Sequence, residues 1–438
     1  MKAIASQLAA IVSPEGVYEW ENLDATRQAE IIKAIASPTT PSCIDYPRSQ
    51  AELAAVIAQA DSNSWRILPF GSGSKISWGG LAKDIQVLVS TQRLNQIIQH
   101  AVGDLTLTVE AGTPFAQIQT TLASRGQFLA LDPSTPESAT IGGIVATADT
   151  NSLRQRYHSV RDQLLGISFV RADGQIASAG GRVVKNVAGY DLMKLFTGSY
   201  GSLGIITQVT FRVYPLPKAS GTVVLTGEAE AIAKATSTLR GSALTPTKAD
   251  LLSTQLVANL GIGKGLGLIT RFGSMSESVK EQSQKLVEVG QLLGLQTAIY
   301  SNRDEADLWQ QLSTQIQNSP QSQSLSCKIG VLPSTAIATL NQLDQIAPQQ
   351  AIGLIHAGSG LGLLRFDGTN VKTHTVLQMR TFCQTQGGFL SILEAPVAFK
   401  QQLDVWGYRG NAMELMRRIK QQFDPKNILS PYRFVGGI

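Results

Sequence analysis

The sequence is poor in the residues that build metal centres and disulfide frameworks. Its 438 residues include three cysteines, Cys43, Cys327 and Cys383, which lie far apart and form no CxxC pair. We therefore expect neither an iron–sulfur cluster on cysteine ligands nor a disulfide framework, and reduced thiols fit a cytosolic protein. The four histidines show no HxH or HExxH spacing, so the pattern predicts no metal site.

Long apolar runs and clusters of basic residues are also missing. No run approaches the roughly 20 apolar residues of a membrane span. The formal charge of +5 comes from 37 basic and 32 acidic residues without a Lys/Arg patch, which argues against nucleic acid as a partner. A modest cationic face toward an anionic ligand remains as an alternative to ordinary surface charge. The N-terminus predicts a mature helix rather than a signal peptide, hence a cytoplasmic protein whose partners supply any contact with the inner face of a membrane.

Strand and helix patterns alternate along the first half of the chain. Residues 1–40 read as helical, and residues 49–63 predict a helix with Ser49 as N-cap and Glu52 three residues later. The segments WRILPF, IQVLVS and DLTLTVEAG predict strands, and PFAQIQTTLASRG predicts a helix that stops at Gly126. The alternating strand QVTFRVYPLP ends in two prolines that mark a domain boundary.

The second half contains an internal echo. GKGLGLITRF, from Gly263, and GSGLGLLRF, from Gly358, are each followed by a helical stretch and then by a short strand. Two matching β-α-β pieces predict an α+β domain with antiparallel pairing, of the ferredoxin-like kind. Chance similarity between glycine-rich strands is the competing interpretation.

Three glycine-rich motifs stand out in the first half. PFGSGSKISWGG, Pro69–Gly80, could turn successive N–H groups toward an anion, or could be a flexible hairpin. It is not a Walker loop, because the pattern GxxxxGK[ST] is absent, and it is not a Rossmann fingerprint, because Ile76 occupies the place of the third glycine. Around Gly142 and Gly143 a polar loop turns into a small-residue helix, a common junction that can also hold a pyrophosphate.

The third motif is VVKNVAGYDLMKLFTGSYGSLGIIT, Val183–Thr207, which places four glycines in an apolar segment. A strand or helix loses stability at each glycine, so something close to the backbone must need the room. A flat aromatic ligand is one interpretation, and tight packing of strand on helix is the other.

The order and separation of these motifs resemble a known family. The region from about Cys43 to Pro217 resembles the FAD-binding domain of the vanillyl-alcohol oxidase/para-cresol methylhydroxylase superfamily. With FDPKNILSPYRF near the C-terminus, the third motif is similar to the FAD-binding subunits of bacterial glycolate oxidases. The resemblance implies an α+β fold with a two-part FAD-binding domain at 41–217 and a ferredoxin-like cap at 218–400. It also implies a helical segment at 1–40 and a C-terminal segment at 401–438 that packs back on the FAD domain.

The resemblance further implies where FAD is held. The first motif would wrap the pyrophosphate, and the other two would line the cofactor and support its flavin and adenosine parts, with glycines providing clearance. Lys75 stands where relatives that attach FAD covalently carry a histidine, so non-covalent FAD is expected. The residues carried over as cofactor contacts are Pro69, Phe70, Gly71, Ser72, Gly73, Ser74, Lys75, Pro133, Thr140, Gly142, Gly143, Thr147, Asp162, Gly189, Tyr190, Gly204, Ile205 and Ile206.

The chain departs from the family around its substrate motifs. HAGSGLGLLRF keeps His356 but has Ser359 in place of an acid and Leu363 in place of a second histidine, so no metal is expected. The candidates for chemistry are His356 as a base and Arg365 as a cation that holds the substrate carboxylate. The alternative interpretations are that His356 is a hydrogen-bonded structural histidine and that Arg365 is a solvated surface charge. Nearer the cofactor motifs, His158 stands where relatives have a glycine.

These features lead to a functional expectation with two alternatives. The resemblance implies the FAD-binding subunit of a glycolate dehydrogenase complex, which oxidises glycolate to glyoxylate beside a catalytic flavoprotein subunit and an iron–sulfur subunit. A self-sufficient FAD-dependent D-2-hydroxy acid dehydrogenase of the D-lactate type is the first alternative. A non-catalytic, flavin-free scaffold is the second, and the intact glycine loops argue against it.

Overall fold

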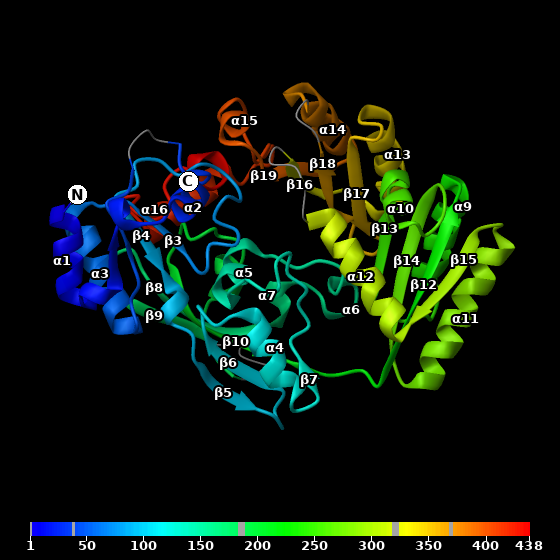
Figure 1. The fold of residues 1–438 in the computed structure, drawn as a ribbon, viewed down its shortest axis with the longest axis horizontal. Coiled ribbons are helices and arrows are strands. Elements are labelled where there is room, and N and C mark those ends of the chain that lie inside the picture. The colour runs from blue at the N-terminus through cyan, green and yellow to red at the C-terminus, as the bar shows by residue number, and fades with distance from the viewer. Residues whose placement is uncertain (1, 37–39, 183–188, 318–323, 368–370) are drawn as a thin grey trace. The chain divides into compact units, whose positions relative to one another are not determined.

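The chain forms two compact units, each of mixed helices and strands (Figure 1). The computed structural model describes residues 2–36, 40–182, 189–317, 324–367 and 371–438. The first unit contains the chain up to Thr150, then Ser159–Pro215 and Lys400–Ile438. The second unit contains Asn151–His158 and Leu216–Phe399.

A four-stranded sheet forms one part of the first unit, in the order β1-β2-β4-β3. β2 and β3 pair with β4 in parallel, and β1 pairs with β2 antiparallel. Both faces are buried, because alternate side chains of these strands enter two separate hydrophobic cores. The elements of this part are α1 (Lys2–Val12), β1 (Val17–Glu19), α2 (Ala25–Ile32), β2 (Cys43–Asp45), α3 (Gln50–Asn63), β3 (Ile67–Phe70) and β4 (Val87–Ser90).

An antiparallel five-stranded sheet forms the other part, in the order β5-β6-β10-β8-β9. Its hydrophobic core contains side chains of the helices that lie between β6 and β10 in the sequence. These elements are β5 (Ile97–Ala101), β6 (Thr106–Glu110), α4 (Phe115–Ala123), β7 (Gln127–Phe128), α5 (Ile141–Thr147), α7 (Val160–Gln163), β8 (Leu164–Val170), β9 (Ile176–Gly180), α8 (Leu192–Phe196), β10 (Ile205–Arg212) and β11 (Tyr214–Pro215), of which β7 and β11 form a two-stranded ribbon.

The C-terminal segment of the first unit is tied to both sheets. Helix α16 (Met413–Phe423) packs on the five-stranded sheet, with the Phe423 ring 5.7 Å from that of Phe196. The buried ammonium of Lys420 donates to Asp424 Oδ2 at 2.6 Å and to the carbonyl oxygens of Ser202 and Leu429 at 2.8 Å. The end of α16 and the loop that follows it are therefore held against the turn that leads into β10.

The second unit is one antiparallel eight-stranded sheet in the order β15-β12-β14-β13-β17-β18-β16-β19 (Figure 1). Its strands are β12 (Ala219–Gly227), β13 (Lys248–Leu252), β14 (Leu266–Ser274), β15 (Gln296–Ser301), β16 (Leu325–Gly330), β17 (Ala351–His356), β18 (Leu361–Phe366) and β19 (Phe389–Glu394). Its helices are α6 (Arg154–Tyr157), α9 (Ala229–Gly241), α10 (Thr254–Leu260), α11 (Ser276–Leu292), α12 (Asn302–Gln317), α13 (Ala336–Ile346) and α14 (Thr373–Thr385), and α15 (Val397–Gln401) crosses into the first unit.

The eight-stranded sheet is a duplication of a four-stranded ferredoxin-like half. In each half the strands lie in the order fourth, first, third, second, counted along the chain, and a helix follows the first strand and another follows the third. The two echoed glycine-rich segments become β14 and β18, which are the third strands of their halves. The predicted α+β fold with a ferredoxin-like domain is thus confirmed, and the echo reflects a structural repeat.

Local expectations hold in some places and fail in others. The Ser49 side chain caps α3 by accepting from the Glu52 N–H at 3.1 Å, as the capping pattern predicts. The expectation that the first 40 residues are helical is wrong for Val17–Glu19, which pair with β2, because alternating side chains of that short strand fit a sheet edge. Helix α4 ends at Ala123, short of Gly126. His158 has φ of 64° and ψ of −160°, a backbone region that glycine adopts readily.

Candidate cofactor site

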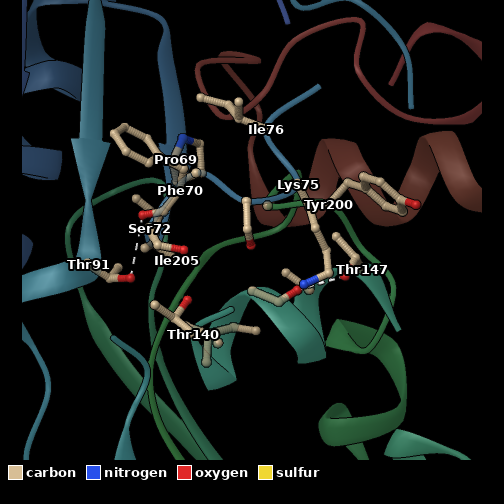
Figure 2. A pocket seen from close by; sticks show the side chains of 18 of the residues that line it. Pro69, Phe70, Ser72, Lys75, Ile76, Thr91, Thr140, Thr147, Tyr200 and Ile205 are labelled. Carbon is tan, nitrogen blue, oxygen red and sulfur yellow. Dashed lines mark hydrogen bonds between the residues drawn. The ribbon is translucent and has the colours of Figure 1, made fainter. Parts of the chain in front are cut away.

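A cavity in the first unit lies where the two sheets of that unit meet the C-terminal segment. Five pieces of chain line it: the end of β3 with the loop that follows it, Thr91 after β4, helix α5 with the residue before it, the turn that leads into β10, and Arg433. Figure 2 shows Thr140 and Thr147 on the helical side, with Phe70, Ser72 and Ile205 toward the strands. Segments that are far apart in the sequence thus converge on one hollow.

The loop after β3 has unused backbone donors. Among the residues that the structure describes, the N–H groups from Gly71 to Lys75 donate to no acceptor. The carbonyl groups of this loop are engaged instead: Ser90 Oγ donates to Gly71 O at 2.9 Å, and Arg27 Nη1 donates to Ser72 O at 3.1 Å. A run of free N–H groups in a turn is an anion-binding feature, which favours the nest interpretation over a flexible hairpin.

Several glycines of the site are required by the packing of chain against chain. A Cβ on Gly71 would come within 2.0 Å of Thr140 Oγ1, and one on Gly142 within 2.7 Å of Ala111 Cβ. Gly201 has φ of +73°, and its Cβ would come within 2.8 Å of the Pro69 ring. Both interpretations of the glycines therefore apply, since the same residues pack the chain tightly and line the cavity.

A buried ion pair lies at one wall of the cavity. Lys75 Nζ is 3.1 Å from Asp149 Oδ2, and both side chains are about 95% buried. Asp149 also accepts from the N–H and the hydroxyl of Ser134, each at 2.9 Å. Asp149 thus neutralises Lys75 and joins the loop after β3 to the segment that contains Ser134.

Tyr200 forms part of another wall and packs against two further aromatic rings. Tyr200 lines the cavity, and its ring is 5.0 Å from that of Trp406 and 6.1 Å from that of Phe434. Burial raises the pKa of the Tyr200 phenol far above its usual value, so the group stays neutral. Tyr200 has φ of 54°, a left-handed conformation that non-glycine residues seldom adopt and that often marks functional positions.

The cavity brings together most of the residues expected to contact the cofactor. Pro133, Asp162, Gly189 and Tyr190 are not among its lining residues. Asp162 closes a capping box with Ser159, and Tyr190 is 89% exposed. Val183 to Ala188 of the third motif lie outside the described residues. The predicted residues that do line the cavity are Pro69, Phe70, Gly71, Ser72, Gly73, Ser74, Lys75, Thr140, Gly142, Gly143, Thr147, Gly204, Ile205 and Ile206.

Further lining residues were not predicted as contacts. Thr91 follows β4, the parallel neighbour of β3. Ligands often bind beyond the carboxyl ends of parallel strands, so the strand pattern of the sequence could have indicated this residue. Arg433 comes from the C-terminal segment, and only tertiary structure brings it to the cavity. The others are Ile76, Ala146, Tyr200 and Gly201.

The two candidates for substrate chemistry lie in the second unit and are not brought together. His356 Nδ1 is 2.6 Å from Asp250 Oδ1, and Ser152 Oγ donates to Asp250 Oδ2 at 2.5 Å. Arg365 donates to both carboxylate oxygens of Asp367, at 2.5 to 3.0 Å. Arg365 pairs across the sheet with Ile352, at the end of β17 opposite to His356.

No group of three or more His, Cys, Asp or Glu side chains in the described ranges could hold a metal ion. No helix in the described part of the chain is long and apolar enough to cross a membrane.

Comparison with known proteins relates the first unit to FAD-binding proteins. Residues 41–180 match the family described as the FAD binding domain, and residues 406–434 match the C-terminal domain of FAD linked oxidases. The first match contains the loop after β3 and α5, and the second contains Arg433. The chain therefore carries an FAD-binding domain, and FAD is its cofactor.

Relatives are similar over all or part of the chain. The glycolate oxidase subunit GlcD of Bacillus subtilis strain 168 is 25% identical, over 98% of this chain and 96% of its own length. The glycolate oxidase subunit GlcE of Escherichia coli K12 is 39% identical over 40% of this chain and 49% of its own length. The mitochondrial D-lactate dehydrogenase [cytochrome] of Arabidopsis thaliana is 25% identical over 90% of this chain and 73% of its own.

Solved structures share the fold. p-Cresol methylhydroxylase with bound substrate superposes with a TM-score of 0.78 at 15% identity, covering 99% of this chain and 96% of that one. A 4-ethylphenol oxidase from Gulosibacter chungangensis gives 0.76 at 15% identity, with 99% and 96% covered. The predicted two-part FAD-binding fold of the vanillyl-alcohol oxidase type is confirmed.

The residues of the cavity fit FAD. Thr140 Oγ1 and Arg433 Nη1 are buried atoms of the lining with no hydrogen-bond partner in the described structure. Buried polar groups without partners are costly, and an anionic, hydrogen-bonding ligand would satisfy both. Together with the free N–H groups from Gly71 to Lys75, they form a donor set suited to a pyrophosphate and a flavin.

Proposed function

We propose that this FAD-dependent oxidoreductase is the FAD-binding subunit of a 2-hydroxy acid dehydrogenase complex, with glycolate as the substrate that is oxidised to glyoxylate. The observation that carries the proposal is the cavity in the first unit, whose donors and glycines fit FAD. The full-length similarity to a glycolate oxidase subunit supports the substrate. The similarity to GlcE, which is also a glycolate oxidase subunit, supports the complex.

The roles of the lining residues follow from their chemistry. The free N–H groups from Gly71 to Lys75 would hold the pyrophosphate, and Thr140 Oγ1 would donate a further hydrogen bond. Tyr200 would lie against the flat flavin ring. Bound FAD supplies the hydride acceptor for the carbon that bears the substrate hydroxyl. Lys75, which stands where relatives that attach FAD covalently carry a histidine, is paired with Asp149, and this supports non-covalent FAD.

The polar side chains of the second unit support a reaction that is shared between subunits. Arg365 is paired with Asp367, and one ring nitrogen of His356 is bonded to Asp250. Side chains engaged in this way are less available for a substrate carboxylate or a hydroxyl proton. We therefore propose that a catalytic flavoprotein partner and an iron–sulfur partner complete the reaction and carry the electrons onward.

A self-sufficient dehydrogenase is the second candidate. Full-length similarity to D-lactate dehydrogenase of Archaeoglobus fulgidus supports it, at 23% identity over 98% of both chains. His356 would then be the base, because Asp250 fixes the proton on Nδ1 and leaves Nε2 with a lone pair.

The test is an absorption spectrum of the purified chain, followed by anaerobic addition of glycolate and of D-lactate. We expect flavin bands that stay oxidised with either acid until the partner subunits are added. Bleaching of the bands by the isolated chain would contradict the subunit proposal, and its loss in His356→Gln would then identify the base. A chain that binds no flavin after reconstitution with FAD would contradict both candidates.

A further inference from the structure

Asp45 is a buried carboxyl group that the proposed function leaves without a role. It is the last residue of β2, its side chain is fully buried, and neither of its oxygens has a partner in the described structure. The strand pairing places it beside Val89 of β4, which offers only an apolar side chain. A buried polar group without a hydrogen bond is costly, so this one calls for an explanation.

Arg93 carries an unpartnered nitrogen at the same edge of the sheet. It ends the short helical turn η3 (Thr91–Arg93), which follows β4, the parallel neighbour of β2. Its Nη2 donates to Glu15 O at 2.9 Å, and its guanidinium carbon lies 5.4 Å from the centre of the Tyr46 ring. Its Nη1 is buried and has no partner among the described residues, and no ion pair joins it to Asp45. An acid and a cation thus lie at the carboxyl ends of adjacent strands with polar atoms left unpaired.

The charge of Asp45 changes close to neutral pH. Burial and, to a smaller extent, the Glu52 carboxylate of α3 raise the pKa of Asp45 to about 8, against the opposing effect of the Arg93 charge. Cys43 of the same strand stays a neutral thiol, because burial raises its pKa to about 12. At pH 7 Asp45 is therefore mostly neutral and attracts Arg93 weakly. Once it ionises, a buried carboxylate gains strongly from a guanidinium partner, because the interior screens the two charges little.

The turn η3 also touches the cofactor cavity. Thr91 lines the cavity, where Figure 2 shows it on the side of the strands. Its hydroxyl donates to Phe70 O at 3.5 Å, and the hydroxyl of Ser90, the residue before η3, donates to Gly71 O at 2.9 Å. These two hydrogen bonds tie the start of η3 to the loop after β3, whose free N–H groups suit an anion.

The strand order gives the direction of any movement. β4 lies between β2 and β3, so Asp45 is on one side of η3 and the loop after β3 is on the other. Pairing of Arg93 with Asp45 would move η3 toward β2 and stretch the hydrogen bonds that hold the loop. The form of the loop that fits FAD therefore belongs to the neutral state of Asp45.

We propose that Asp45 and Arg93 form a pH-sensitive switch beside the cofactor cavity. While Asp45 is neutral, Arg93 stays on the Tyr46 ring and the loop after β3 keeps the form that binds FAD. When Asp45 ionises, it pairs with Arg93 Nη1 and draws η3 away from the loop, so the affinity for FAD falls. This inference rests on the FAD site of the first unit and is independent of the substrate and of any partner subunit.

The test is the dissociation constant of FAD, measured by fluorescence titration of the FAD-depleted full-length chain at pH 6, 7, 8 and 9. Asp45 carries its proton in the state that binds FAD well, so the affinity is highest at low pH and is lost as the pH rises through about 8. We expect the dissociation constant to rise about fivefold or more between pH 6 and pH 9. Asp45→Asn should keep the affinity of the low-pH form at every pH, because an amide does not ionise.

Substitutions of Arg93 and Glu52 separate the switch from a simple buried acid. Arg93→Met removes the partner, so the affinity should stay constant from pH 6 to pH 9, whereas Arg93→Lys keeps the charge and should keep the pH dependence. Glu52→Gln removes a carboxylate that raises the pKa of Asp45, so the midpoint of the change should move to lower pH. Arg66→Met is the matched control and should behave as the wild type, because Arg66 pairs with Asp84 at 2.6 Å and does not line the cavity.

Three outcomes would overturn the proposal. They are a wild-type affinity that does not change between pH 6 and pH 9, a fall in affinity that persists in D45N, and a fall that persists in R93M. If D45N and R93M fail to fold, the wild type and E52Q decide, and a midpoint that stays in place in E52Q would overturn the proposal as well. A wild-type chain that binds no FAD at any pH would contradict the FAD site itself, and the switch with it.

Discussion

Lys75 and Asp149 form an ion pair of 3.1 Å that is almost completely buried at the wall of the cavity in the first unit. Two buried charges are stable together but costly apart, because each loses its hydration in the interior. Asp149→Asn should therefore lower the free energy of unfolding by about 3 kcal/mol or more, measured by urea titration. Ser134→Ala is the matched control, since it removes one hydroxyl donor to Asp149 but leaves the ion pair, and it should cost about 1.5 kcal/mol. Equal effects of the two substitutions would contradict this reasoning.

Gly71 should not tolerate a side chain. The Cβ of Gly71→Ala would lie 2.0 Å from Thr140 Oγ1, so the loop after β3 would have to move away from α5. We expect the purified variant to retain less than a tenth of the wild-type flavin content, measured from the ratio of flavin to protein absorbance. Gly103→Ala is the control, because a Cβ there meets nothing within 4 Å. A G71A protein with full flavin content would show that the loop adapts.

Asp45 should make the protein less stable as the pH rises. Its carboxyl group is fully buried, both oxygens lack a partner in the described structure, and burial raises its pKa to about 8. The folded state then binds more protons than the unfolded state between pH 4 and 8. Stability from this group is present below pH 4 and is lost as the pH rises toward 8, by roughly 1.4 kcal/mol per pH unit within the window.

Asp45→Asn should remove this dependence, because an amide does not titrate. Urea midpoints at pH 5, 6, 7 and 8 measure the effect, and the exposed Asp104→Asn variant is the control. A slope that is unchanged in D45N would assign the pH dependence to other groups.

His158→Gly should stabilise the protein. At φ of 64° and ψ of −160° a histidine is strained, whereas glycine adopts this backbone freely. The loss of this backbone strain should outweigh the larger conformational entropy that glycine has in the unfolded chain. The free energy of unfolding should therefore rise by about 1 kcal/mol. His158→Ala keeps a Cβ and should bring no gain. A loss of stability in H158G would mean that the imidazole makes a compensating contact.

Asp250 should be critical for the second unit. The Asp250 carboxylate accepts hydrogen bonds from His356 and Ser152. Asp250→Asn weakens both bonds and should lower the free energy of unfolding by about 3 kcal/mol. Replacing both members of the main pair, in Asp250→Asn with His356→Leu, should recover part of this loss because no buried imidazole is then left unpaired. Thermal unfolding of the two variants measures the difference, and a further loss in the double variant would contradict the pairing.

Sequence patterns predicted the elements whose causes are local. The capping pair of Ser49 and Glu52, the strands on either side of the Gly71 loop and the small-residue helix after Gly142 depend on neighbours in the chain. The resemblance to FAD-binding proteins then assigned the three glycine-rich motifs to one cofactor site, and residues of all three line the cavity. Contacts that depend on distant parts of the chain were beyond such patterns. Arg433 reaches the cavity only because Lys420 and its partners hold the C-terminal segment in place, and Tyr200 does so through a left-handed turn.

The seam between the halves of the eight-stranded sheet points to the history of the second unit. β13 and β17 are the second strands of their halves, and they pair antiparallel through Asp250–His356, Leu251–Ile355 and Leu252–Leu354. Contact between equivalent strands in opposite directions is the two-fold, isologous geometry of a homodimer interface. Fusion of two copies of an ancestral subunit would leave this arrangement. After fusion the seam no longer had to be self-complementary, so the Asp250–His356 pair no longer needed a symmetry-related copy of itself on the other side of the axis.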